Sequence, residues 1–194
     1  MLLQHQKRIM AIAGMAMTAY LVFHMLSNLS FFQAARFESF YDWYNGPVRW
    51  VVLVAMLLAI AIHVNAAIRI RRVNAKARTV DYKKHDKFKV PAFFVTLSIV
   101  FLLGFILLHI VQTLLFDSSN VYGELVQLFQ SKLMVLFYLA GLFVLMMHLQ
   151  HSLANVLQTL GKTSTTCHVL VWAGTLSLIG GFALIPLTIY FTLP

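Results

Sequence analysis

Four histidines lie inside four successive apolar spans of the sequence: His24, His63, His109 and His148. Each follows the start of its span by about sixteen residues. An ionisable side chain at membrane depth is costly, so each of these histidines is a candidate for function. Because neutral imidazoles are common metal ligands and bind haem iron axially, four histidines at matched depth predict two pairs of axial ligands for two haems.

The elements that must position these histidines are membrane spans. Of the 194 residues, 60% are hydrophobic and 11% are charged, whereas soluble domains are about 45–50% apolar and about 25% charged. A span needs about 20 apolar residues to cross the hydrocarbon core. Five such spans occur, at residues 9–32, 48–68, 90–116, 131–157 and 168–193. The sequence therefore predicts an all-α membrane bundle of five transmembrane helices, with residues 1–194 forming a single domain.

Basic residues are concentrated on one side of these spans. Residues 69–89 hold nine lysines and arginines against two aspartates, and Lys7, Arg8 and Lys162 fall on the same side. The loops on the opposite side are close to neutral. The positive-inside rule therefore predicts a cytoplasmic N-terminus and an outer C-terminus.

The dense basic segment at residues 69–89 allows three interpretations. It could anchor the protein at anionic lipid headgroups, at about 1 kcal/mol for each basic residue near the surface. It could dock a partner protein on the cytoplasmic face. A short loop between two spans does not favour the third interpretation, nucleic-acid binding.

Two of the outer segments are predicted to be short interfacial helices. Aromatic residues at 37–44 precede Asn45, Gly46 and Pro47, a pattern typical of an interfacial helix that ends in a turn. Residues 121–130 form the second candidate.

Helix direction divides the histidines into pairs, because a helix rises 1.5 Å per residue. Spans one and three run outward and place His24 and His109 at one depth, whereas spans two and four run inward and place His63 and His148 at another. The two pairs then differ in depth by roughly 15 Å. Two histidines from facing helices at one depth are what a six-coordinate b-type haem needs. With both axial positions filled, such a haem would transfer electrons.

Other interpretations of the histidines stay open on spacing alone. His151 lies three residues after His148 on the same helix face, so either could be the inner ligand. An intramembrane histidine can also be a hydrogen-bonded packing residue or part of a proton path. A metal site without haem would need its ligands at one depth, whereas these histidines occupy two.

Several short motifs occur in order along the chain. Residues 7–14 read KRIMAIAG and residues 24–29 read HMLSNL. His63 is followed by Asn74, Ala77, Arg78 and Tyr82, and residues 147–152 (MHLQHS) are followed by QTLG at 158–161. In this combination the chain resembles the membrane-anchor cytochrome b subunit of succinate:quinone oxidoreductases and fumarate reductases (complex II), in the form with five spans and two haems. Ser27 and Ser152 depart from it, because glycine is common at those positions.

The resemblance implies a function and a choice of ligand. In that family the first histidine of the fourth span is the ligand, which favours His148 over His151. A flavoprotein subunit oxidises succinate, an iron–sulfur subunit relays electrons, and the anchor passes them to a membrane quinone, here expected to be menaquinone. The chain would then be a subunit of an enzyme without itself oxidising succinate. It would lie in a bacterial cytoplasmic (inner) membrane, contact lipid and bind no nucleic acid, with its basic segment helping to dock the iron–sulfur subunit.

Residues for the quinone and for the haem propionates are chosen from charge and depth. Ser27, Asn28, Glu38 and Asp42 are candidates for contact or proton exchange with an outer quinone. Glu38 and Asp42 could equally be solvated loop carboxylates. The propionate candidates are Arg49 and Lys132 for the outer haem and Arg69 and Arg72 for the inner haem.

The main alternative is a di-haem cytochrome b anchor of another quinone-linked enzyme, such as nitrate reductase, hydrogenase or formate dehydrogenase. Those anchors commonly place two ligands on one helix with wide spacing. No span here carries two histidines about a dozen residues apart, which favours complex II. A haem-free transporter or assembly protein is the alternative from a different class.

Overall fold

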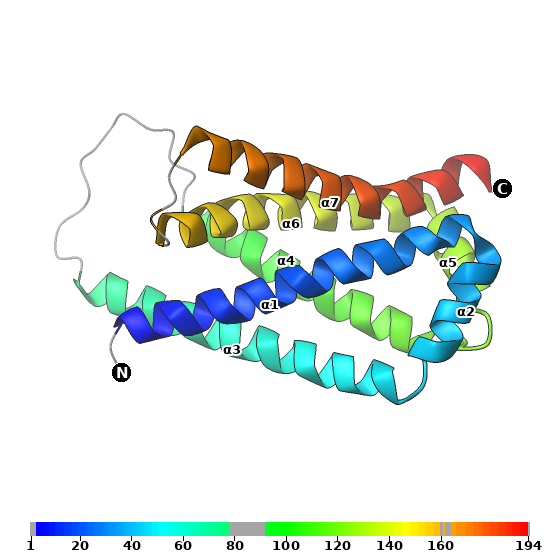
Figure 1. The fold of residues 1–194 in the computed structure, drawn as a ribbon, viewed down its shortest axis with the longest axis horizontal. Helices are drawn as coiled ribbons and strands as arrows, with labels where there is room; N and C mark the ends of the chain where they lie inside the picture. The colour runs from blue at the N-terminus through cyan, green and yellow to red at the C-terminus, as the bar shows by residue number, and fades with distance from the viewer. Residues whose placement is uncertain (1–2, 78–91, 160, 162–163, 194) are drawn as a thin grey trace. The chain divides into compact units, whose positions relative to one another are not determined.

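All secondary structure in the described residues is helical. The computed structural model describes residues 3–77, 92–159, 161 and 164–193. In chain order the helices are α1 (Leu3–Leu29), η1 (Ser30–Phe32), α2 (Ala34–Tyr44), α3 (Pro47–Ala77), α4 (Ala92–Leu115), α5 (Val121–Gln130), α6 (Lys132–Thr159) and α7 (Thr165–Thr192) (Figure 1). The prediction of an all-α fold is confirmed.

Five of these helices, α1, α3, α4, α6 and α7, are long and apolar enough to cross a membrane, which confirms the five predicted spans. The chain is therefore a multi-pass membrane protein. Helices α1 and α3 extend beyond the apolar runs at their charged ends, because charged residues in water can continue a helix that lies partly in lipid. The 31 residues of α3 are the clearest case: at 1.5 Å per residue they span about 46 Å, more than the ~30 Å of a hydrocarbon core.

The two short helices predicted at the span ends are also present, as α2 and α5. Asn120 begins α5, because its side chain accepts a hydrogen bond from the Gly123 backbone N–H. Ser164 begins α7 by accepting from the Cys167 N–H in the same way. Pro47 begins α3, where its missing N–H costs nothing.

The chain divides into two units. Unit 1 contains described residues 3–23 and 46–77, and unit 2 contains 24–45, 92–159, 161 and 164–193. Helix α1 contributes its first part to unit 1 and its last six residues to unit 2. Within unit 2, α6 packs against α4 and α7, and α5 packs against α2, α6 and α7. The single domain over residues 1–194 stays a prediction.

Aromatic side chains fill the core of unit 2 near the short helices. Phe31 of η1 stacks on Tyr122 of α5 with ring centroids 4.6 Å apart, and Phe37 of α2 lies edge-on against Phe31 at 5.8 Å. Phe31, Phe37 and Phe129 are buried. The segment that directly follows α1 is thus packed against α2 and α5, next to the end of α1 that carries His24.

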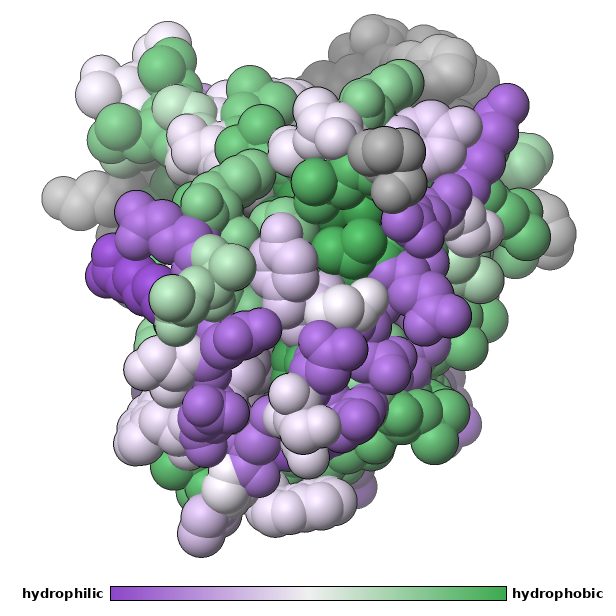
Figure 2. Space-filling view, turned by 90° about the vertical axis from the view of Figure 1, so that its right-hand side faces the viewer, coloured by the Kyte–Doolittle hydropathy of each residue, from purple (hydrophilic) through white to green (hydrophobic). Residues whose placement is uncertain are grey.

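The outward sides of the long helices carry apolar residues. Val51, Leu115, Leu133 and Phe191 are each about 70–80% exposed. In a membrane protein, exposed apolar surface of this kind faces lipid. Figure 2, which looks onto the end that carries α2 and α5, shows hydrophilic residues gathered there with hydrophobic residues around them.

Candidate functional site

His24 and His109 lie side by side in unit 2. Their ring centroids are 5.8 Å apart, with the ring planes at 63°. His24 comes from the last part of α1 and His109 from α4. Apolar rings flank the pair: Phe182 of α7 lies 5.6 Å from His24, and Phe105 stacks at 6.4 Å from His109.

The separation of these two rings fits two axial ligands of one iron. A metal–imidazole bond is about 2 Å long, as in zinc sites, and a ring nitrogen lies about 1.15 Å from its ring centroid, so two such bonds on opposite sides of one metal hold the centroids about 6.3 Å apart. The observed 5.8 Å is about 0.5 Å shorter than that separation. His24 and His109 could therefore hold a haem iron between them.

His109 has a polar partner on the neighbouring helix. Its Nδ1 lies 3.2 Å from the Tyr138 hydroxyl of α6, which in turn donates a hydrogen bond to Gln112 Oε1 at 2.8 Å. Tyr138 is buried, with 8% of its surface exposed. Metal-binding histidines commonly use one ring nitrogen for such a contact and the other for the metal.

His24 also takes part in a hydrogen-bonded chain. The Tyr41 hydroxyl donates to Asn28 Oδ1 at 2.8 Å, and Asn28 Nδ2 donates to His24 Nε2 at 3.3 Å. Burial, with Tyr44 nearby, raises the pKa of Tyr41 well above its usual range, so the phenol remains a hydrogen-bond donor at physiological pH. Binding of iron at His24 Nε2 would require the Asn28 amide to turn away.

His63 belongs to unit 1, where α1 holds it through the backbone. Its Nδ1 lies 3.1 Å from the Met10 carbonyl oxygen. A carbonyl can only accept, so Nδ1 carries the hydrogen and Nε2 carries the lone pair that a metal needs. Gly14, one turn after Met10, lets the helix come close: a Cβ there would lie 3.4 Å from His63 Cε1.

The two histidines of α6 differ in burial. His148 is half-buried, whereas His151 is exposed and its Nε2 lies 3.0 Å from Asn155 Nδ2 on the same helix. His148 is part of unit 2 and His63 is part of unit 1, so the predicted inner pair stays a prediction.

The quinone candidates lie at the end of α1 and in α2. Ser27 donates its hydroxyl to the His24 carbonyl oxygen at 2.9 Å, and Asn28 lies between Tyr41 and His24. Glu38 and Asp42 are exposed. Of the four, Asn28 is the one in contact with a candidate ligand side chain.

The four propionate candidates lie near the ends of the spans. The Arg49 guanidinium lies 5.8 Å from the Trp50 ring centroid, and Lys132 is exposed at the start of α6. Arg69 donates to Asn65 Oδ1 at 3.0 Å, and Arg72 is exposed. Their roles stay predictions.

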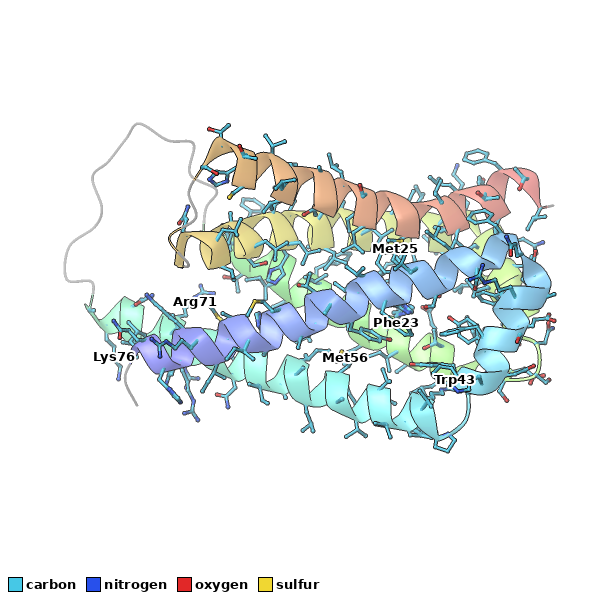
Figure 3. The ribbon with its side chains drawn as sticks, viewed as in Figure 1. Phe23, Met25, Trp43, Met56, Arg71 and Lys76 are labelled. Atoms are coloured by element: carbon cyan, nitrogen blue, oxygen red, sulfur yellow. The ribbon has the colours of Figure 1, made fainter. Side chains whose placement is uncertain are left out.

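The described part of the basic segment lies at the end of α3, where Figure 3 labels Arg71 and Lys76. Asn74 and Ala77 of the second-span motif fall there too. The basic residues of the segment from Arg78 onward and Lys162 lie outside the described residues, as do Tyr82 and Leu160 of the sequence motifs.

Sequence analysis missed the residues that surround the histidines. Tyr138 and Gln112 are polar residues inside apolar spans, and such residues are costly in lipid without a partner. That signal could have identified both. Met10 acts through its backbone and gives no signal in the sequence.

Within the described residues, no cluster of three or more His, Cys, Asp or Glu side chains could hold a metal ion. A bis-histidine haem has two protein ligands and so would not form such a cluster. Comparisons with known protein families, with curated proteins and with solved structures find no match for this chain.

Proposed function

We propose that this chain is the di-haem cytochrome b anchor of a succinate:quinone oxidoreductase. The observation that carries the proposal is the side-by-side contact of His24 with His109 at 5.8 Å, close to the separation that two imidazoles on one iron would have. The contact joins two membrane helices at one place along their length, as the sequence predicts for an outer pair. The motif order along the chain supports complex II in particular.

The residues around the pair have distinct tasks in this proposal. His24 and His109 hold the outer haem, and His63 and His148 the inner one. A bound haem b would supply one-electron transfer. Tyr138 orients His109, and the Met10 carbonyl orients His63. Asn28, beside His24 and bonded to Tyr41, is the best-placed contact for an outer quinone.

The charge distribution supports the proposed partners. Arg69, Arg71, Arg72 and Lys76 at the end of α3 face the cytoplasm and help to dock the iron–sulfur subunit, which carries electrons from the flavoprotein subunit. The two haems would supply the one-electron steps between the iron–sulfur subunit and a quinone, expected to be menaquinone. Moving one electron through the membrane field changes its free energy by about 2.3 kcal/mol per 100 mV.

Haem content tests the proposal directly. A reduced pyridine haemochrome spectrum of the purified protein is expected to show two haem b per chain. His24→Ala and His109→Ala should each lose the same haem by EPR, whereas the matched control His151→Ala should retain both. A colourless wild-type protein would exclude the cytochrome and favour a haem-free transporter.

The partners decide between complex II and the other di-haem anchors. Gentle purification of the tagged chain from its native membrane should recover a flavoprotein and an iron–sulfur subunit with succinate dehydrogenase activity. Recovery with molybdenum or nickel subunits would instead assign the chain to a nitrate reductase, formate dehydrogenase or hydrogenase.

A further inference from the structure

We infer that Met134, Gln112 and Tyr138 form a directional hydrogen-bond chain that fixes which ring nitrogen of His109 carries its hydrogen. Tyr138 is thereby a positioning residue for the outer haem. The inference rests on the proposed function where it concerns haem, but the state of the His109 ring can be tested without haem.

The direction of the hydrogen-bond chain is set at Gln112, whose side-chain amide is held in one orientation. Its Nε2 lies 3.6 Å from Met134 Sδ, and its Oε1 lies 2.8 Å from the Tyr138 hydroxyl. A thioether sulfur can accept a hydrogen bond but cannot donate one. The NH₂ group of Gln112 therefore belongs on the Met134 side, which leaves the amide oxygen facing Tyr138.

The orientation of Gln112 sets the direction of the next two bonds. A phenol has a single hydrogen, and Tyr138 donates it to Gln112 Oε1. The phenol oxygen can then only accept at its 3.2 Å contact with His109 Nδ1. His109 must carry its hydrogen on Nδ1, so Nε2 has the lone pair that coordinates a metal.

The packing keeps these groups in register. Gln112 lies three residues after His109 on α4, and Tyr138 lies four residues after Met134 on α6, so each pair shares a helix face. Phe105 and Phe129 lie edge-on against the Tyr138 ring, with centroids 5.4 and 4.8 Å away. These two rings restrict the phenol to the position from which it reaches His109.

The hydrogen bond also alters the ligand electronically. An acceptor at Nδ1 makes the imidazole a stronger donor at Nε2, and the bond from Tyr138 to Gln112 polarises the phenol oxygen and strengthens its acceptance. A more basic ligand stabilises ferric iron, so the hydrogen-bond chain would lower the reduction potential of the haem that His109 would hold.

Redox titration of the haem protein in Tyr138→Phe tests the electronic effect. The variant should retain two haems per chain, with the reduction equilibrium of the outer haem shifted up to about tenfold towards the ferrous form, or about 59 mV for one electron. Gln112→Leu should shift the same haem in the same direction, because the phenol oxygen is then no longer polarised by its bond to Gln112 and accepts more weakly from His109. Tyr190→Phe, which removes a phenol that is 36% exposed on α7, is the matched control. An unchanged outer-haem potential in both test variants would overturn the inference.

Nitrogen NMR of protein labelled with ¹⁵N-histidine tests the ring state without haem. The His109 signals, identified by their loss in His109→Gln, should show hydrogen on Nδ1 in the wild type and a mixture of both forms in Tyr138→Phe and Gln112→Leu. Hydrogen on Nε2 in the wild type would overturn the inference, even in a protein that binds haem. Absence of haem with the Nδ1 form present would reject the proposed function and leave the hydrogen-bond chain intact.

Discussion

His63 in unit 1 and His109 in unit 2 reach the same chemical state by different means. Each has an oxygen atom about 3 Å from Nδ1, at 3.1 Å for His63 and 3.2 Å for His109. For His63 the acceptor is the Met10 backbone carbonyl, which cannot donate and which no substitution removes. For His109 the acceptor is the Tyr138 phenol, whose direction depends on Gln112.

Because the two acceptors differ, the two histidine sites should be sensitive to different kinds of substitution. The backbone acceptor requires α1 to approach α3 closely, so unit 1 depends on the small residue at position 14. The phenol acceptor requires correctly oriented side chains, so unit 2 depends on polar residues within apolar helices. Unit 1 should therefore be sensitive to added volume, and unit 2 to the loss of single polar groups and to the packing that holds them.

Added volume at Gly14 should have the largest effect. A Cβ there would lie 3.4 Å from His63 Cε1 and 3.5 Å from Nδ1, so the larger side chain of Gly14→Leu must displace the ring. We expect loss of the inner haem, seen as one haem per chain instead of two and loss of its EPR signal. Gly14→Ala is the control, because its methyl group makes an ordinary contact and should leave both haems. Two haems in Gly14→Leu would show that unit 1 tolerates volume and would remove the proposed contrast.

Gly141 tests the packing beneath His109 in unit 2. A Cβ at this position would lie 2.5 Å from the ring of Phe105, which itself stacks near His109. Overpacking of this kind costs about 1–3 kcal/mol, so Gly141→Ala should lower the free energy of unfolding by that amount. Denaturation in detergent measures the change.

Gly104 on α4 is the matched control, because a Cβ there would meet nothing within 4 Å. Gly104→Ala should stabilise the helix by up to about 0.5–1 kcal/mol, since alanine restricts the unfolded chain. If Gly141→Ala and Gly104→Ala change the free energy of unfolding equally, the Phe105 ring can move away from position 141 without destabilising the protein.

An effect no larger than that of Gly141→Ala is expected at Asn28, which extends the comparison to His24. Asn28→Ala leaves the Tyr41 hydroxyl without its 2.8 Å acceptor, at a cost of about 1–3 kcal/mol if the phenol stays buried and less if water reaches it. In the background of Tyr41→Phe the same change should cost less, because no donor is then left unsatisfied. A double-mutant cycle measures this coupling, and additive effects of the two changes would exclude it.

The sequence predicts the helices well and their contacts only in part. Apolar runs locate five spans, but they do not reveal that α3 continues to Ala77, because hydrophobicity marks the lipid-buried part of a helix and not its end. The count along the spans places His24 and His109 at one depth, and in the structure the two rings lie side by side.

The hydrogen-bond partners of these histidines are harder to predict from the sequence than the spans are. Contact between Tyr138 and His109 depends on how α4 and α6 are rotated about their axes, which spacing along one helix does not determine. Gln112 could have been predicted to lie near His109, because it follows His109 by three residues and hence shares its helix face. The role of the Met10 carbonyl could not have been predicted, because every residue has a backbone carbonyl and only the approach of α1 to α3 determines which one contacts His63.

The smallest predicted effect is the loss of stability at alkaline pH that comes from the Tyr41 phenol, the donor to Asn28. Burial and Tyr44 raise the pKa of the Tyr41 phenol, whereas in the unfolded chain the phenol ionises near its ordinary value of about 10. Its contribution to stability is therefore complete below about pH 10 and declines as the pH rises above that, by at most about 1.4 kcal/mol per pH unit. Unfolding of the wild type and of Tyr41→Phe, compared between pH 8 and pH 11, should show a shallower decline in the variant. Equal declines would mean that water reaches Tyr41 in the folded protein.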